Sequence, residues 1–121
     1  MHLTPRETER LLIYVAAELA RRRWRNGMKL NYPEAMAVIC DELLEQARGG
    51  TKRLSEVIAF GSRILTKEDV MEGVAELMPI IQVEGMFPDG SKLITVYEPI
   101  RLPNREELAN ETYITLGEGR P

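Results

Sequence analysis

Apolar and polar residues alternate with a period of two in one stretch of the chain, residues 80–100. Two runs rich in Val, Ile, Phe, Tyr and Thr flank Pro88-Asp89-Gly90-Ser91, a strong turn signal. We therefore expect an antiparallel β-hairpin. One face would carry Ile81, Val83, Phe87, Ile94 and Val96, and the more polar face would carry Gln82, Glu84, Met86, Leu93, Thr95 and Tyr97. The first face is expected to lie on a core.

Two loop lengths fit the turn of this hairpin. A two-residue loop at Asp89-Gly90 would place Phe87 opposite Lys92 and Val83 opposite Val96, and it keeps the two faces distinct. A three-residue loop over residues 88–90, with Gly90 left-handed, suits the proline better but mixes the faces. We predict the first register. Because an isolated hairpin is marginally stable in water, the helices before it are expected to cover it.

The pattern before the hairpin is helical. A cap residue, a proline and a glutamate in Thr4-Pro5-Arg6-Glu7 predict a helix that begins there, runs to about Arg25 and ends at Asn26-Gly27. Its middle is apolar at seven consecutive positions, residues 11–17. One stripe suffices for a surface helix, and that stripe would be Leu11, Leu12, Val15 and Leu19, with Ile13, Tyr14 and Ala17 largely on the other side. The apolar residues outside this stripe indicate either a contact with another protein or a helix at the centre of the core.

This helix ends in a run of four arginines and one tryptophan, Arg21-Arg22-Arg23-Trp24-Arg25. Their position offsets the helix dipole, so salt-bridged or solvated side chains are the favoured interpretation. The alternative is a nucleic-acid patch with a stacking tryptophan.

A second helix is predicted from the cap signature Asn31-Tyr32-Pro33-Glu34 to Gly49-Gly50. Its apolar stripe would be Met36, Ile39, Cys40, Leu43, Leu44 and Ala47, with Asp41, Glu42 and Glu45 opposite. Cys40 lies within the stripe, so we interpret it as a structural thiol rather than a nucleophile.

The rest of the helical region is shorter. A third helix is expected from after Thr51 to about Leu65, and Gly61 within it suggests close approach of another backbone. Thr66 should cap a short helix that carries Val70 and Met71 and breaks at Gly73. The fold class is thus α+β: a bundle of three main helices plus a short helix, followed by an antiparallel β-hairpin.

The tail, residues 101–121, has few apolar residues and cannot form a core of its own. Residues 105–110 could form one or two helical turns, and residues 113–116 a short strand. We therefore predict a domain over residues 1–100 and a C-terminal extension over residues 101–121, which would be an arm on a neighbouring subunit or loosely ordered.

Composition is that of a globular protein of one domain, 121 residues with a formal net charge of −3. We expect no membrane segment, no secretory signal and, with one cysteine, a cytoplasmic location. The acidic balance argues mildly against nucleic acid as a partner.

Residues that carry chemistry are scarce. There is one histidine, His2; no His/Cys pair has metal-ligand spacing; and Gly49-Gly50 lacks the residues of a phosphate-binding loop. We accordingly predict no catalytic, cofactor-binding or metal-binding residue in this chain.

Several blocks, in the same order along the chain, resemble the urease gamma subunit. They are Met1 to Glu7, Met28 to Ala35, Leu65 to Val74, Ile81 to Glu84 and Phe87 to Leu93. Together they are specific, although each alone would be a weak signal. Two features depart from the family: Ala75 where the family tends to have proline, and a tail longer than usual. In some members of the family the gamma subunit is fused to the beta subunit.

The resemblance implies a non-catalytic assembly subunit of the nickel enzyme that hydrolyses urea to ammonia and carbamate. It implies alpha and beta subunits as partners, in a trimer of alpha-beta-gamma units. Nickel would be bound by the alpha subunit and not by this chain. The expected interface lies on the surplus apolar side of the first helix and on the strand edges of the hairpin.

The alternative from the residues alone is a winged-helix-like DNA-binding domain, because three helices followed by a hairpin is also its order. Its third helix would offer only Lys52, Arg53 and Arg63 as cations, with Glu56 among them.

Overall fold

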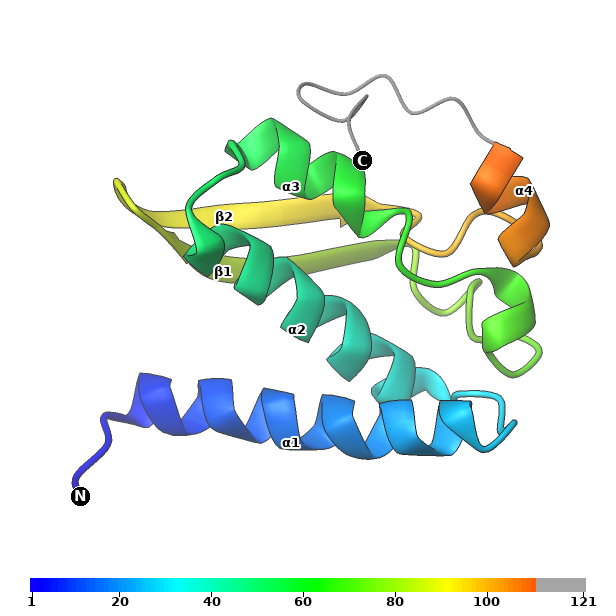
Figure 1. Cartoon of the computed structure of the whole chain (residues 1–121), viewed down its shortest axis with the longest axis horizontal. Helices are drawn as coiled ribbons and strands as arrows, with labels where there is room; N and C mark the ends of the chain where they lie inside the picture. Colours follow the sequence, from blue (N-terminus) through cyan, green and yellow to red (C-terminus); the bar gives the residue numbers. More distant parts are fainter. Residues whose placement is uncertain (111–121) are drawn as a thin grey trace.

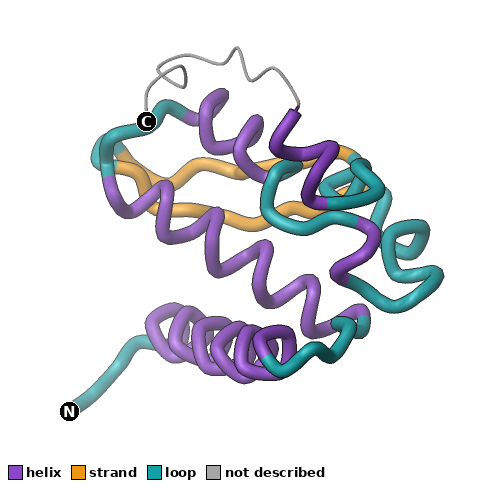
Figure 2. The backbone as a smooth tube through the Cα atoms, turned by 45° about the vertical axis from the view of Figure 1, so that its right-hand side comes forward, coloured by secondary structure: helices purple, strands orange, loops and turns teal. Residues whose placement is uncertain are grey.

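The first helix, the other helices and the hairpin form successive layers. The computed structural model describes residues 1–110. Its elements are α1 (Pro5–Arg25), α2 (Tyr32–Gly49), α3 (Leu54–Gly61), the 3-10 turn η1 (Lys67–Asp69), β1 (Ile80–Phe87), β2 (Gly90–Tyr97) and α4 (Arg105–Asn110). Helices α2 and α3 cover one face of the hairpin, and α1 packs on α2 (Figures 1 and 2). The predicted α+β class is confirmed.

Reciprocal hydrogen bonds begin both long helices where the sequence predicts. The Glu7 amide donates to Thr4 Oγ1 (3.1 Å) and the Thr4 amide to Glu7 Oε1 (2.8 Å). Asn31 and Glu34 make the same pair at 2.9 Å each way. The Asn31 amide, more than the Arg23 guanidinium, lowers the pKa of Glu34. These four bonds satisfy amides that a helix start would otherwise leave unpaired.

The hairpin register differs from both predicted registers. Phe87 pairs with Gly90 and Val83 with Ile94, so the loop is Pro88-Asp89. Proline is favoured at the second position of such a turn, and Gly90 has a φ of 127°, which only glycine adopts readily. The true register is displaced by two residues from the preferred prediction. Because side chains alternate with period two, a displacement by two residues leaves the same side chains on each face. Ile81, Ile94 and Val96 are buried, as predicted.

The third helix is shorter than predicted and ends at Gly61 instead of Leu65. A Cβ atom on Gly61 would lie 2.6 Å from Val96 Cγ2 and 3.2 Å from Leu43 Cδ2. A close approach therefore exists, but a side chain of β2 makes it, not a second backbone. Glycine lets α3 lie directly on the sheet.

The short helix is also smaller than predicted, a single 3-10 turn in which the Thr66 amide and hydroxyl both donate to Asp69 Oδ2 (2.7 and 2.8 Å). The prediction that it carries Val70 and Met71 is wrong. Val70 is extended and forms a parallel bridge with Leu30, whose carbonyl accepts from the Met71 amide at 2.8 Å. Pairing with the loop before α2 thus replaces further helical bonds.

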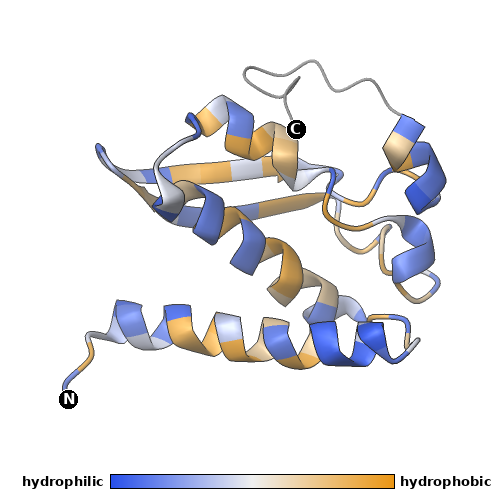
Figure 3. Cartoon of the chain, viewed as in Figure 1, coloured by the Kyte–Doolittle hydropathy of each residue, from blue (hydrophilic) through white to orange (hydrophobic). Residues whose placement is uncertain are grey.

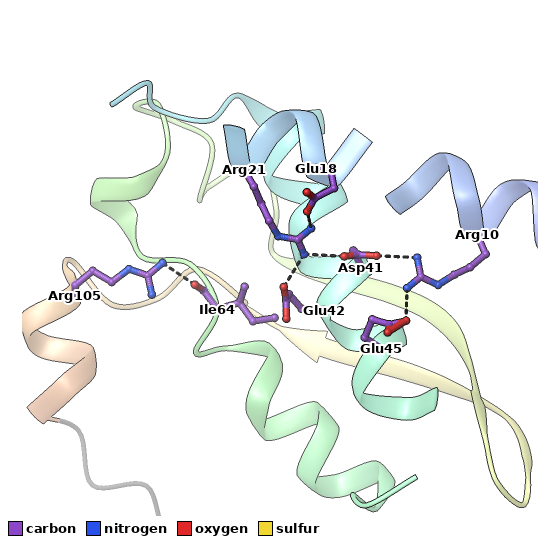
Figure 4. Close-up of polar contacts among 8 residues, drawn as sticks. All are labelled: Arg10, Glu18, Arg21, Asp41, Glu42, Glu45, Ile64 and Arg105. Atoms are coloured by element: carbon purple, nitrogen blue, oxygen red, sulfur yellow. Dashed lines mark hydrogen bonds and ion pairs between the residues drawn. The ribbon is translucent and has the colours of Figure 1, made fainter. Parts of the chain in front are cut away.

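Arg105 ties the C-terminal segment to the rest of the chain. Its guanidinium donates to the Ile64 carbonyl (2.8 Å), pairs with Asp69 (2.9 Å) and lies 4.8 Å from the centre of the Trp24 ring (Figure 4 draws the Ile64 bond). The predicted helical turns are α4, whose Leu108 is buried. Residues 101–110 consequently lie on this chain's own body. The strand predicted for residues 113–116 lies outside the described residues.

Replacing Gly61 with alanine should destabilise the protein by about 1–3 kcal/mol, because the stiff Val96 side chain cannot move away without strain elsewhere in the core. Gly49→Ala is the control: Gly49 ends α2 and has open space around its Cα, so this change should be neutral or slightly stabilising. Urea unfolding followed by circular dichroism measures both. Equal stability of the two variants would contradict the close packing at Gly61.

Candidate protein-interaction surface

Two arginines of α1 share one carboxylate of α2. Arg10 Nη1 lies 2.8 Å from Asp41 Oδ1, and Arg21 Nη2 lies 2.7 Å from Asp41 Oδ2 (Figure 4). The Asp41 side chain is only 4% exposed. The helical pattern predicted an outward position for Asp41, and this prediction is wrong, because α1 covers that side of α2. The missed signal was the spacing of Arg10 and Arg21, three helical turns apart and therefore on one face of α1.

Acidic neighbours complete this cluster. Arg21 also binds Glu18 (2.8 Å) and Glu42 (2.6 Å), and Arg10 binds Glu45 (2.9 Å). Burial alone would lower the pKa of Arg21, but the hydrogen bonds to Asp41, Glu42 and Glu18 outweigh it, and the pKa is raised. Arg21 therefore stays charged, and its ion pairs together with those of Arg10 hold α1 in a fixed rotation.

That rotation turns the predicted core stripe of α1 outward. Ala17 and Ala20 are buried against α2, with Ile13 and Trp24 packed beside them. Leu11, Leu12, Val15, Ala16 and Leu19 are exposed, Val15 by 60%. The prediction that this stripe faces the core is wrong, and so is the interpretation of α1 as a central core helix. Small alanines and the arginine pairs make the contact instead. We call these five exposed residues the outer α1 face.

A second apolar surface lies on the side of the hairpin away from α2 and α3. Ile80, Met86, Leu93 and Tyr97 are exposed there, and we call them the outer hairpin face. Arg6 reaches this side from α1: it pairs with Glu84 and donates to Ser91 Oγ at 3.2 Å. Large exposed side chains gathered on rigid elements are typical of protein contacts.

Several polar side chains elsewhere in residues 1–110 are engaged in contacts within the chain. A groove of about 460 Å³ between α1, α2 and β1 is spanned by two ion pairs, Arg6 with Glu84 and Arg10 with Glu45. Cys40 is buried, as its place in the apolar stripe predicted, and burial raises the pKa of its thiol to about 11. Across residues 1–110, no three His, Cys, Asp or Glu side chains are grouped so as to hold a metal ion. Nor does any helix of this described part have the length and apolarity to cross a membrane.

The arginine-rich end of α1 is salt-bridged, as favoured from the sequence. Arg21 pairs with three carboxylates and Arg23 with Glu34. Trp24 stacks on Arg105 rather than being left for a nucleic-acid base.

Comparison with known proteins agrees with the resemblance drawn from the residues. The chain matches the family described as "Urease, gamma subunit" over residues 1–100. A "Urease subunit gamma/beta" of Pseudomonas syringae pv. tomato is 52% identical over 130 aligned positions, which cover all of this chain and 56% of the relative. A protein of the same description from Pseudomonas syringae pv. syringae is 59% identical over 101 positions, covering 84% of this chain and 43% of the relative. The chain thus spans about half the length of these curated relatives.

Replacing Asp41 with alanine should destabilise the protein by about 3 kcal/mol, because it leaves Arg10 and Arg21 partly buried without their shared carboxylate. Glu45→Ala is the control. Its side chain is 63% exposed, so losing its pair with Arg10 should cost at most about 1 kcal/mol. Thermal and urea unfolding measure both changes. If Asp41→Ala lowers the free energy of unfolding no more than Glu45→Ala does, Asp41 is not the main ionic contact between α1 and α2.

Proposed function

Because the chain belongs to the urease gamma-subunit family, we propose that it is a structural, assembly subunit of urease, the enzyme that hydrolyses urea to ammonia and carbamate. One observation carries the proposal: the family match spans residues 1–100, and two gamma/beta relatives share more than half of the aligned residues. The chain contributes surfaces to the assembly rather than catalytic groups.

The chemistry is assigned to a partner. We propose that a dinickel site in the large alpha subunit carries out the hydrolysis, and that no residue of this chain is catalytic or binds nickel or a cofactor. The engaged state of the polar side chains supports this assignment: Asp41, Asp69, Glu34 and Glu45 each pair with an arginine within this chain.

The partners are the alpha and beta subunits, in a cytoplasmic trimer of alpha-beta-gamma units. The outer hairpin face and the strand edges are the surfaces we assign to them, because apolar side chains stand there on a hairpin held firmly by α2 and α3. We further propose that residues 1–100 are the gamma domain. Residues 101–121 are an extension that starts on this domain, through Arg105, and continues toward a neighbouring subunit.

The winged-helix alternative receives no support from the family match. It would place α3 in the major groove of DNA, and α3 is a helix of eight residues that carries the acidic Glu56.

Co-expression of this chain, carrying an affinity tag, with the beta and large alpha subunits of a urease tests the assignment. We expect the large chain and its urease activity to co-purify, whereas the chain alone neither hydrolyses urea nor binds nickel tightly in equilibrium dialysis. Urea hydrolysis by the purified chain alone would overturn the proposal. Tight, salt-dependent binding to duplex DNA would instead favour the winged helix.

Within that experiment, Leu93→Glu should lower recovery of the large subunit at least tenfold, because it puts a charge where the outer hairpin face is 56% exposed and available for contact. Leu77→Glu makes the same chemical change at a 66% exposed loop position and should leave recovery unchanged. If Leu93→Glu assembles as well as Leu77→Glu, the large subunit does not bind the outer hairpin face.

A further inference from the structure

The segment that follows the hairpin is held by a site on the rest of the chain, and we call residues 102–108 the strap. The Lys67 amide donates to the Leu102 carbonyl at 2.8 Å, and the Glu68 amide donates to the Pro103 carbonyl at 3.1 Å. Both amides belong to the first residues of the turn η1, so the turn itself offers them no acceptor. The backbone of the strap therefore supplies the acceptors that η1 lacks.

Arg105 adds three side-chain contacts to the same site. Its guanidinium donates to the Ile64 carbonyl (2.8 Å), pairs with the buried carboxylate of Asp69 (2.9 Å) and lies 4.8 Å from the centre of the Trp24 ring. A planar guanidinium can stack on an aromatic ring and still donate to two oxygens in its plane, which the ammonium of lysine cannot do. The site therefore recognises arginine, and not merely a positive charge.

The far end of the strap is anchored by one apolar side chain. Leu108 is 9% exposed, and its carbonyl accepts from Arg63 Nη2 at 3.4 Å. Asn104 Oδ1 accepts from the Glu107 amide at 2.8 Å and so caps α4. Figure 3 shows α4 as largely hydrophilic, at the end of the molecule opposite the hairpin turn. One apolar contact and a set of polar contacts thus hold the strap in place.

The strap lies outside the family domain, although the residues that hold it lie inside. The gamma-subunit match ends at residue 100, whereas the gamma/beta relative from Pseudomonas syringae pv. tomato aligns with all of this chain. The strap is therefore a segment that aligns with a gamma/beta protein beyond the part that the gamma family defines.

We propose that the strap and its site form a docking pair closed by Arg105, which fixes the point and direction in which the chain leaves the gamma domain. A junction held at its backbone, at Arg105 and at Leu108 cannot swing about residue 100 as a free linker would. In a gamma/beta chain, such a junction gives the beta portion a fixed starting point; this consequence rests on the proposed function, whereas the docking rests on the contacts alone. Arg105 is a positioning residue in this pair.

Amide hydrogen exchange of the full chain, followed by NMR, tests the docking. The Lys67 and Glu68 amides should be protected, and Arg105→Gln should speed their exchange at least about tenfold, because it removes charged hydrogen bonds that hold the strap. Arg105→Lys should show most of this effect, since it keeps the charge but loses the planar donor group. The control is Arg25→Gln, the loss of an exposed arginine next to Trp24, which should leave both amides protected.

A spin label on residue 110 tests whether the exit from the domain is fixed. Asn110→Cys offers an exposed thiol for the nitroxide label, and the other cysteine, Cys40, is buried. The label should tumble with the domain, and Arg105→Gln should make it several times more mobile. Leu108→Glu should do the same without changing Arg105, because it removes the apolar anchor. Protected amides in the hairpin show that each variant remains folded.

The proposal is overturned if Arg105→Gln changes the exchange of the Lys67 and Glu68 amides no more than Arg25→Gln does. A label on residue 110 that is equally mobile in all variants would also overturn it. Should Arg105→Gln remove protection from the hairpin as well, Arg105→Lys supplies the same comparison in a less disruptive form. None of these measurements needs another urease subunit, so their outcome is separate from the assignment as a urease subunit, which rests on co-purification and activity.

Discussion

A single buried carboxylate determines where the first helix lies and which of its sides meets solvent. Asp41 accepts from Arg10 and Arg21, which are three turns apart on α1, and so fixes both the position of that helix along α2 and its rotation. Helix α1 offers α2 little apolar contact, since only Ala17 and Ala20 are fully buried. The ionic contact therefore carries specificity that a larger apolar contact would otherwise supply, and it leaves the leucines of α1 free for another surface.

Local signals predicted the helix starts and the hairpin faces correctly. Features that depend on long-range contacts, such as the inward side of α1, were predicted wrongly. Thr4 with Glu7, and Asn31 with Glu34, act within one turn, so their spacing in the sequence is sufficient. The inward side of α1 could not be read from apolarity, because the true contact uses alanines and arginines whose carboxylate is 20 to 31 residues away. The predicted hairpin register was wrong because a shift by two residues leaves the same side chains on each face, so the hydrophobic pattern cannot distinguish the two registers.

Of the candidate surfaces, the sequence revealed the surplus of apolar residues on α1 but not which of them would be exposed. The outer hairpin face was described only as the more polar side, yet it carries Met86, Leu93 and Tyr97 in exposed positions. Both surfaces fit a chain whose family is that of a urease subunit. For such a chain, burial within the monomer is only part of the packing, and sequence patterns that assume one core assign residues to the wrong side.

The contacts of Arg105 have a consequence for the order of events during synthesis. This one side chain joins the end of α1, the segment before η1 and the residues after the hairpin, through Trp24, Ile64 and Asp69. The ribosome makes α1, α2 and the hairpin before Arg105 emerges. The earlier elements can pair as they appear, but Asp69 and the Trp24 ring can contact Arg105 only after about the last tenth of the described chain has been made. Completion of these contacts is thereby coupled to the arrival of the C-terminal segment, because in a chain that ends before residue 105 the Trp24 ring lacks its stacked cation and Asp69 lacks its arginine.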